Sequence, residues 1–178
     1  MSEAAIKLAR ALSQRAGIPC RFEIADAERL PYPEGFFDKI VCSSSMEHFS
    51  DDSQALREMT RVLKPGGRVV LTVDSFNYPI SDELRARHQR RCSVVHYYTR
   101  ETLETSLHGA GQELCRSEYL LNSFLTDFFY KLWIRYPQPA LVSLAISFFG
   151  YPAFLVAEKV FGRKGRGYTL LAESSKTG

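Results

Sequence analysis

The sequence predicts a single doubly wound α/β domain. Two observations support this prediction: a strand–helix–strand pattern between residues 37 and 73, and a chain length and composition that suit one core. A short, mostly apolar run at 37–42 is followed by an amphipathic helical pattern, a Lys-Pro-Gly-Gly stop and a second apolar run at 69–73. This order is typical of a strand–helix–strand unit with parallel, buried strands. The chain has 178 residues, of which 45% are hydrophobic, so one domain with its own core is expected.

A helix is expected at the start of the chain, from Ser2 to Ala16, because small and apolar side chains recur there at helical spacing. Gly17 and Pro19 end this pattern. The next stretch, 20–25, alternates apolar and charged residues and predicts an edge strand with one solvent-exposed face.

The strand–helix–strand unit predicts where on the sheet a ligand would bind. Its helix carries Leu56, Met59 and Val62 on one face, opposite a charged face. Because the crossover between parallel strands is right-handed, both strands end on the same edge of the sheet, where open α/β sheets bind ligands. The segments 43–48 and 74–75 are therefore expected to face one crevice.

Composition narrows the classes of function. A net charge of +3 is too small to indicate a nucleic-acid partner. The four cysteines are far apart and form no CxxC pair, which favours reduced core thiols over a metal site or disulfides. They are Cys20, Cys42, Cys92 and Cys115. The charged first helix does not resemble a cleavable signal peptide, so the cytoplasm is the expected location.

The C-terminal half begins with a strongly basic run at 84–91. Such a run predicts a solvated helix face, and attraction of an anionic substrate or lipid headgroup is the alternative. Thr99 is the expected N-cap of a further helix that ends at Gly111, and a strand is expected at 112–121.

Two blocks of sequence carry a resemblance to a known family. They are DAERLPYPEGFFDKIVCSSSMEHFSDD at 26–52 and LREMTRVLKPGGRVVLTV at 56–73. They resemble the middle of class I S-adenosylmethionine-dependent methyltransferases of the small-molecule kind called type 11. The resemblance is close over residues 1–75 and looser beyond. It implies a Rossmann-like, mostly parallel sheet with an antiparallel last strand, S-adenosyl-L-methionine as cofactor, and methyl transfer to a small molecule.

The family's first strand, its glycine-rich turn and its second strand have no counterpart here, since no GxGxxG or GxGxG occurs in the sequence. The resemblance therefore implies a domain shortened at its amino terminus. Two alternatives stay open: a shortened form of a longer enzyme, or a variant in which the chain itself or a partner chain closes the gap in the sheet, where unpaired backbone would be costly.

The resemblance also assigns roles at the cofactor. Asp26 would accept a hydrogen bond from the adenine amino group, the Ala27 N–H would donate to the ring, and Leu30 would form part of the wall. A turn-forming role for Asp26 is the alternative. The expected cofactor-binding residues are Asp26, Ala27, Glu28, Leu30, Cys42, Ser43 and Ser44.

Methyl transfer from a sulfonium is an in-line displacement, for which proximity and orientation supply most of the catalysis. Glu47 and His48 are the candidate catalytic residues, because they can orient the acceptor or take its proton. Packing of His48 against the following helix is the alternative. Tyr97, Tyr98 and Asp74 are expected near the acceptor, with core or lid packing as the alternative for the tyrosines.

The segment 122–167 is an insertion rich in apolar and aromatic residues, placed before the returning strand at 167–173. Its part from 137 to 157 has no charged side chain and approaches the length of a transmembrane span. Three alternatives remain open: a helical hairpin that covers the pocket as a lid, docking at a membrane surface helped by basic residues at 159–166, and a true span. The first two favour a lipophilic acceptor.

Two classes of function therefore remain on the sequence. One is an S-adenosylmethionine-dependent enzyme. The other is a non-catalytic methyltransferase remnant that acts as a binding or membrane-associating module, which the absent glycine loop favours. No metal site is expected in either case.

Overall fold

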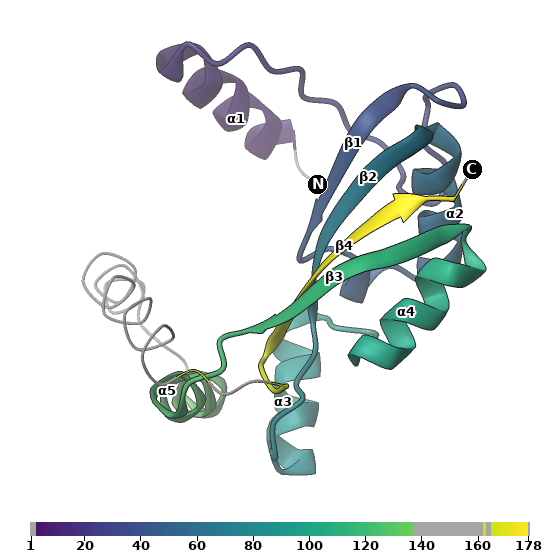
Figure 1. Ribbon diagram of the computed structural model, residues 1–178. Helices are drawn as coiled ribbons and strands as arrows, with labels where there is room; N and C mark the ends of the chain where they lie inside the picture. The colour runs from purple at the N-terminus through teal and green to yellow at the C-terminus, as the bar shows by residue number, and fades with distance from the viewer. Residues whose placement is uncertain (1–2, 137–161, 163–164, 178) are drawn as a thin grey trace.

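The computed structural model describes residues 3–136, 162 and 165–177. Figure 1 shows the arrangement of its helices and strands. In chain order they are α1 (Glu3–Ala16), β1 (Phe37–Ser43), the single-turn helix η1 (Met46–His48), α2 (Asp52–Val62), β2 (Leu63–Asp74), α3 (Asp82–Cys92), α4 (Arg100–Gly109), β3 (Gln112–Leu120), α5 (Phe124–Arg135) and β4 (Thr169–Lys176).

The strands form one mixed sheet in the order β1-β2-β4-β3. β1 and β2 are parallel, as the strand–helix–strand pattern predicts, whereas β4 lies antiparallel to both β2 and β3. The antiparallel last strand is confirmed, but a mostly parallel sheet is not, because only one of these three pairings is parallel. The expectation of a mostly parallel sheet counted the 20–25 strand and further parallel neighbours, which the described part of the chain does not contain.

The predicted strand at 20–25 is wrong. These residues belong to no helix or strand and are largely exposed. Alternation of apolar and charged side chains cannot make a strand by itself, since a strand needs a neighbour whose backbone groups pair with its own. In the described structure β1 pairs with β2 alone, so its other edge is open, and Val41 on this edge strand is 75% exposed.

Two glycines shape the amino end of β2, just after α2 ends at Val62. Gly66 has a φ of +70°, in the left-handed region. A Cβ on Gly67 would lie 2.7 Å from the Cγ of Leu63. The Lys-Pro-Gly-Gly segment therefore ends the helix as predicted, and Leu63 is already the first residue of the strand rather than part of the helix.

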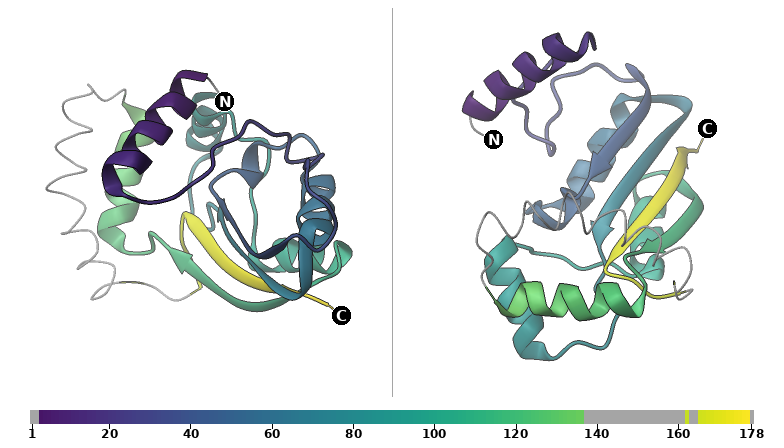
Figure 2. Two further views of the ribbon diagram at one scale, coloured as in Figure 1. Left: turned by 90° about the horizontal axis from the view of Figure 1, so that it is seen from above. Right: turned by 90° about the vertical axis from the view of Figure 1, so that its left-hand side faces the viewer.

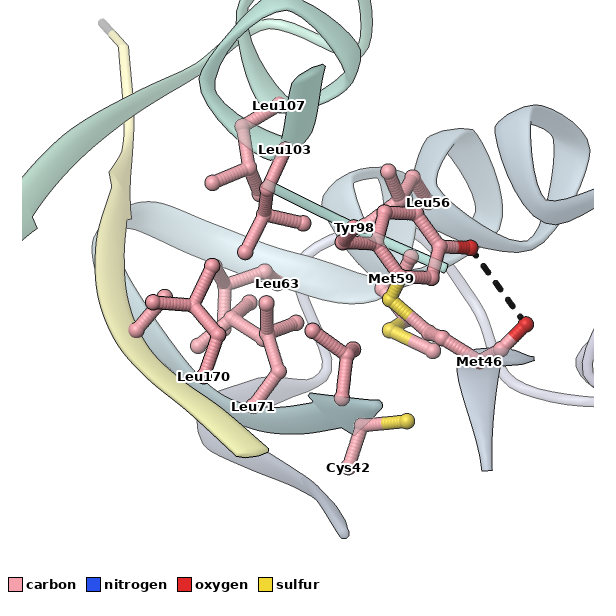
Figure 3. Close-up of a cluster of buried hydrophobic side chains, with 13 residues drawn as sticks. Cys42, Met46, Leu56, Met59, Leu63, Leu71, Tyr98, Leu103, Leu107 and Leu170 are labelled. Carbon is pink, nitrogen blue, oxygen red and sulfur yellow. Dashed lines mark hydrogen bonds between the residues drawn. The ribbon is translucent and has the colours of Figure 1, made fainter. Parts of the chain in front are cut away.

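The main core lies between the sheet and the helices α2 and α4, which cover one face (Figure 1). Figure 3 shows its side chains converging from η1, α2, β2, α4 and β4. Its labelled members are Cys42, Met46, Leu56, Met59, Leu63, Leu71, Tyr98, Leu103, Leu107 and Leu170. The other face is less covered, because α1 stands apart from the sheet in Figures 1 and 2, with Ile6 as its one buried residue among those described. The described residues thus do not form the predicted doubly wound arrangement with helices packed on both faces.

A second, aromatic cluster lies beyond the carboxyl end of β2, between α3 and α5. Its buried members are Phe76, Tyr78, Ile134 and Tyr168. The Tyr130 and Tyr168 rings stack at 4.3 Å between centroids, and the Tyr168 hydroxyl donates to Asp127. These contacts hold α5 against the segment that leads into β4.

All four cysteines are free, yet the prediction of core thiols holds fully for Cys42 alone. Cys20 is exposed because its segment forms no strand, and Cys115 is exposed at the irregularity between Leu114 and Arg116. The uncharged segment 137–157 lies outside the described residues. Among the helices described, none is long and apolar enough to cross a membrane.

Candidate functional site

The carboxyl ends of β1 and β2 lie side by side, which brings polar residues from two parts of the chain together. Ser43 is the register partner of Thr72. The Ser44 N–H donates to the Thr72 carbonyl at 2.9 Å and lies 3.0 Å from its hydroxyl. Both serines are exposed, and Asp74 ends β2 just beyond them. This polar edge is the candidate site.

Glu47 is the most deeply buried acidic residue described at this edge, with 1% of its surface exposed. Its backbone carbonyl accepts hydrogen bonds from the N–H groups of Val95 (2.7 Å) and His96 (3.2 Å), so the segment after α3 is tied to η1. Its Oε2 has no hydrogen-bond partner among the residues described. Burial raises the pKa of this carboxyl group, and the nearby Asp74 raises it further.

His48 is exposed beside Glu47. Its Nδ1 lies 3.1 Å from the Ser93 carbonyl, which is a hydrogen bond when that nitrogen carries the proton. The ring therefore contacts the residue that follows α3, not the helix that follows η1, which was the alternative considered from the sequence.

Asp74 faces a histidine that sequence reasoning missed. The carboxyl group is largely buried, and burial raises its pKa to about 6. The Nε2 of His88, on α3, lies 3.8 Å from Asp74 Oδ2. Burial also lowers the pKa of His88 to about 4, so this imidazole is neutral near pH 7 and the contact is not an ion pair.

His88 is held from its other side by Tyr97. The tyrosine hydroxyl lies 2.9 Å from His88 Nδ1, and Phe76 packs on the imidazole with 4.3 Å between ring centroids. The basic run at 84–91 was interpreted as a solvated face, and His88 is its buried exception. One signal was present in the sequence: His88 follows the apolar Leu84 by four residues, on the same face of a helix.

The two tyrosines expected near the acceptor have their hydroxyl groups engaged within the protein. Tyr97 contacts His88, whereas Tyr98 is 4% exposed and donates to Asp52 Oδ2 at 2.7 Å. Figure 3 shows Tyr98 among core side chains together with Cys42. The Cys42 thiol is buried as well, which raises its pKa to about 11. The structure therefore gives Tyr98 and Cys42 contacts of packing residues.

The loop expected to bind adenine is attached to α2. Asp26 accepts the Glu28 N–H at 2.9 Å, which closes a local turn. Glu28 accepts the Asp51 N–H at 3.0 Å, and the Leu30 N–H donates to Glu58 at 2.9 Å. Within the described ranges, no printed hydrogen bond or ion pair joins residues 26–30 to Ser43, Ser44 or Asp74. The predicted residues thus form two groups, one at the strand ends and one along α2.

Two hollows of the described structure lie away from the polar edge. One hollow of about 560 Å³ lies between α3 and α5, and one of about 140 Å³ lies on the open face of the sheet, and neither is lined by Ser43, Glu47 or Asp74. The only paired glycines described lie at the amino end of β2, away from the site. The polar edge therefore fits one wall of a nucleoside site. Within the part of the chain that is described, no cluster of metal ligands occurs.

The described structure is a mixed α/β sheet with a polar edge, and comparison with known proteins finds this arrangement among methyltransferases. Residues 1–71 match a family model described as a methyltransferase domain. This part of the chain therefore resembles class I S-adenosylmethionine-dependent methyltransferase domains, in agreement with the resemblance carried by the sequence blocks.

Two curated relatives illustrate the match. The chain is 47% identical over 66 residues to a demethylmenaquinone methyltransferase of Deinococcus radiodurans, and 41% identical over 81 residues to an uncharacterized methyltransferase, YcgJ, of Bacillus subtilis. The matched parts cover 37% and 44% of this chain, and 27% and 32% of the relatives. The chain thus spans about a third or less of the curated relatives it matches.

Solved structures extend the likeness in fold to nearly the whole chain. The YcgJ structure has a TM-score of 0.61 at 23% identity and covers 99% of this chain and 80% of its own. An S-adenosylmethionine-dependent methyltransferase from Mesorhizobium loti has a TM-score of 0.64 at 22% identity, covering 98% and 77%. At these identities the likeness shows the fold alone.

Proposed function

We propose that this chain takes part in methyl transfer from S-adenosyl-L-methionine to a small, lipophilic acceptor. The observation that carries the proposal is the polar edge formed by Ser43, Glu47 and Asp74, because most of it lies within residues 1–71, which match the methyltransferase domain. The lipophilic acceptor is suggested by a relative whose name specifies a quinone.

The side chains at the edge suit the acceptor better than the cofactor. S-Adenosyl-L-methionine supplies an electrophilic methyl group when it is bound. The two buried carboxyl groups, Glu47 and Asp74, have raised pKa values, which suits them to hold or receive a proton near the acceptor. His48 lies beside them and is exposed, so it can orient an acceptor at the rim.

The cofactor site requires a second wall, and the unpaired edge of β1 indicates where that wall could attach. One edge of β1 is unpaired in the described structure, and an open edge strand is a template for an added strand. We infer that a further β-strand, from a partner chain or another segment, pairs along β1. It would cover Val41 and face Ser43 across the site.

The alternative function is a non-catalytic methyltransferase-like binding module. The absence of a GxGxxG or GxGxG turn from the given sequence favours it. Cofactor binding separates the two functions, since a module that has lost the chemistry has no need to hold the cofactor.

The test is calorimetric titration with S-adenosylhomocysteine. The chain alone is compared with the chain joined at its amino terminus to the first strand, glycine-rich turn and second strand of a methyltransferase of the family that the sequence blocks resemble. The joined protein is expected to bind at least about tenfold more tightly, because the added strand completes the wall.

A pair of variants controls this experiment. Ser43→Leu in the joined protein is expected to weaken binding about tenfold, since Ser43 is exposed at the site. Glu113→Leu, on the exposed far end of β3, should leave binding unchanged. If neither protein binds S-adenosylhomocysteine, the enzymatic proposal fails and the binding-module alternative gains support.

A further inference from the structure

The outward face of α5 combines exposed apolar and basic side chains in a regular stripe. Its members recur three or four residues apart along the helix, with the adjacent pair Lys131 and Leu132 at its centre, which places them on one side. This stripe, termed here the α5 outer face, consists of Phe124, Phe128, Lys131, Leu132 and Arg135. Phe128 is 60% exposed and Leu132 is 38% exposed. With Leu84 of α3, these residues line the hollow of about 560 Å³.

The opposite side of α5 is firmly packed, so the exposure of the outer face does not come from loose attachment. Thr126 and Ile134 are buried, and Tyr130 stacks on Tyr168. The Arg91 guanidinium lies 4.3 Å from the centroid of the Trp133 ring and donates to the Trp133 carbonyl at 2.6 Å. Figure 2 shows α5 lying across α3 on the outside of the molecule.

The charges around this face are mainly positive. On α3, Arg87, Arg90 and Arg91 are exposed, and on α5 Lys131 and Arg135 lie among the apolar residues. Arg87 donates to the Arg135 carbonyl, which brings the two helices' basic groups to one end of the surface. The facing acidic groups are fewer: Asp127, paired with Lys131, Glu83, 4.0 Å from Arg87, and Asp82.

From this combination we propose that the α5 outer face docks on an anionic lipid bilayer, with the arginines of α3 at its rim. Aromatic and aliphatic side chains beside cations are the features of a helix that lies in the plane of a membrane interface. The long basic side chains can bury their stems and keep their charges at the headgroups. A helix of 12 residues is too short to span.

If the proposed function holds, docking through the α5 outer face would also position the candidate site relative to the bilayer. The aromatic cluster links α5 through Tyr130 and Phe76 to His88, and His88 contacts Asp74. Docking would therefore hold the polar edge near the bilayer, where a lipophilic acceptor is concentrated. The docking itself requires no bound cofactor.

Flotation with vesicles tests the proposal on the full chain. The chain should float with vesicles that contain phosphatidylglycerol, and not with pure phosphatidylcholine vesicles, and high salt should weaken the binding because the rim charges are exposed. The double variant Phe128→Ser and Leu132→Ser should lower the bound fraction about tenfold. A matched control, Leu8→Ser and Leu12→Ser on α1, removes exposed leucines elsewhere (61% and 55% exposed) and should change nothing.

A double charge-reversal variant measures the electrostatic contribution to vesicle binding. Arg90→Glu with Arg135→Glu should reduce binding as strongly, whereas Arg57→Glu with Arg100→Glu, on α2 and α4, should not. Circular dichroism confirms that each variant is folded. The proposal is overturned if the chain does not float, or if the Phe128 and Leu132 pair floats like wild type. It is also overturned if light scattering without vesicles shows a dimer that this pair abolishes, because the face would then bind a second copy.

Discussion

Replacing Tyr98 with alanine is expected to lower the free energy of unfolding by about 3–5 kcal/mol. The ring is 4% exposed and packs in the main core, where Figure 3 shows it beside Met46 and Leu56. Removal of a buried ring costs the transfer energy of its atoms and leaves a cavity that the surrounding core fills only in part. Urea unfolding followed by circular dichroism measures the change.

Two further variants separate the contribution of the Tyr98 ring from that of its hydroxyl, and compare a buried tyrosine with an exposed one. Tyr98→Phe keeps the ring and removes the hydroxyl that donates to Asp52, so it should cost about 1–2 kcal/mol. Tyr136→Ala removes a tyrosine that is 51% exposed and should change stability by no more than about 0.5 kcal/mol. A Tyr98→Ala protein as stable as wild type would contradict the packing role and return Tyr98 to the acceptor site.

The second large effect concerns pH. Asp74 has a folded pKa of about 6 against an ordinary value of 3.8. The folded state therefore binds the proton more tightly than the unfolded state, and stability falls as pH rises from about 4 to 6. His88 has a folded pKa of about 4 against 6.5, so the unfolded state binds the proton more tightly and stability rises between about 4 and 6.5. Each shift corresponds to about 3 kcal/mol, and the two oppose each other in the wild type.

A variant that removes one of the two groups, Asp74 or His88, reveals the pH dependence of stability that the other causes. Relative to wild type, Asp74→Asn should gain about 3 kcal/mol of stability on raising the pH from 4 to 6.5, because only His88 then acts. His88→Gln should lose a similar amount over the same range. Urea unfolding at a series of pH values measures both differences. The other charged and titratable groups near this pair are unchanged in all three proteins: Glu47, His48, Arg85, Arg91, Cys92 and Tyr97. Two variant curves parallel to the wild-type curve would contradict the buried pair.

This pair also bears on the site. A carboxyl group that keeps its proton near pH 6, set between a neutral imidazole and a second buried carboxyl, is ready to exchange a proton close to neutral pH. The sequence suggested Glu47 and His48 for that task. The structure places His48 at the exposed rim and two buried carboxyl groups, Glu47 and Asp74, behind it.

The local hydrophobic pattern of the sequence was sufficient to predict several strands and helices. The apolar runs at 37–42 and 69–73 lie in parallel strands, and the helix between them buries Leu56, Met59 and Val62. These predictions succeeded because each depends on periodicity and chain connection within about forty residues. The same connection brought Ser43 and Asp74 to one edge of the sheet.

The sequence by itself determined the strand–helix–strand unit, its turn and the polar edge where its strands end. Only the tertiary structure decided that 20–25 is not a strand, that His88 is buried and that Tyr98 belongs to the core. The physical reason is that pairing and burial depend on what distant segments bring to a residue. The 20–25 stretch meets no strand to pair with, His88 meets α5 and the aromatic cluster, and Tyr98 meets α2 and η1.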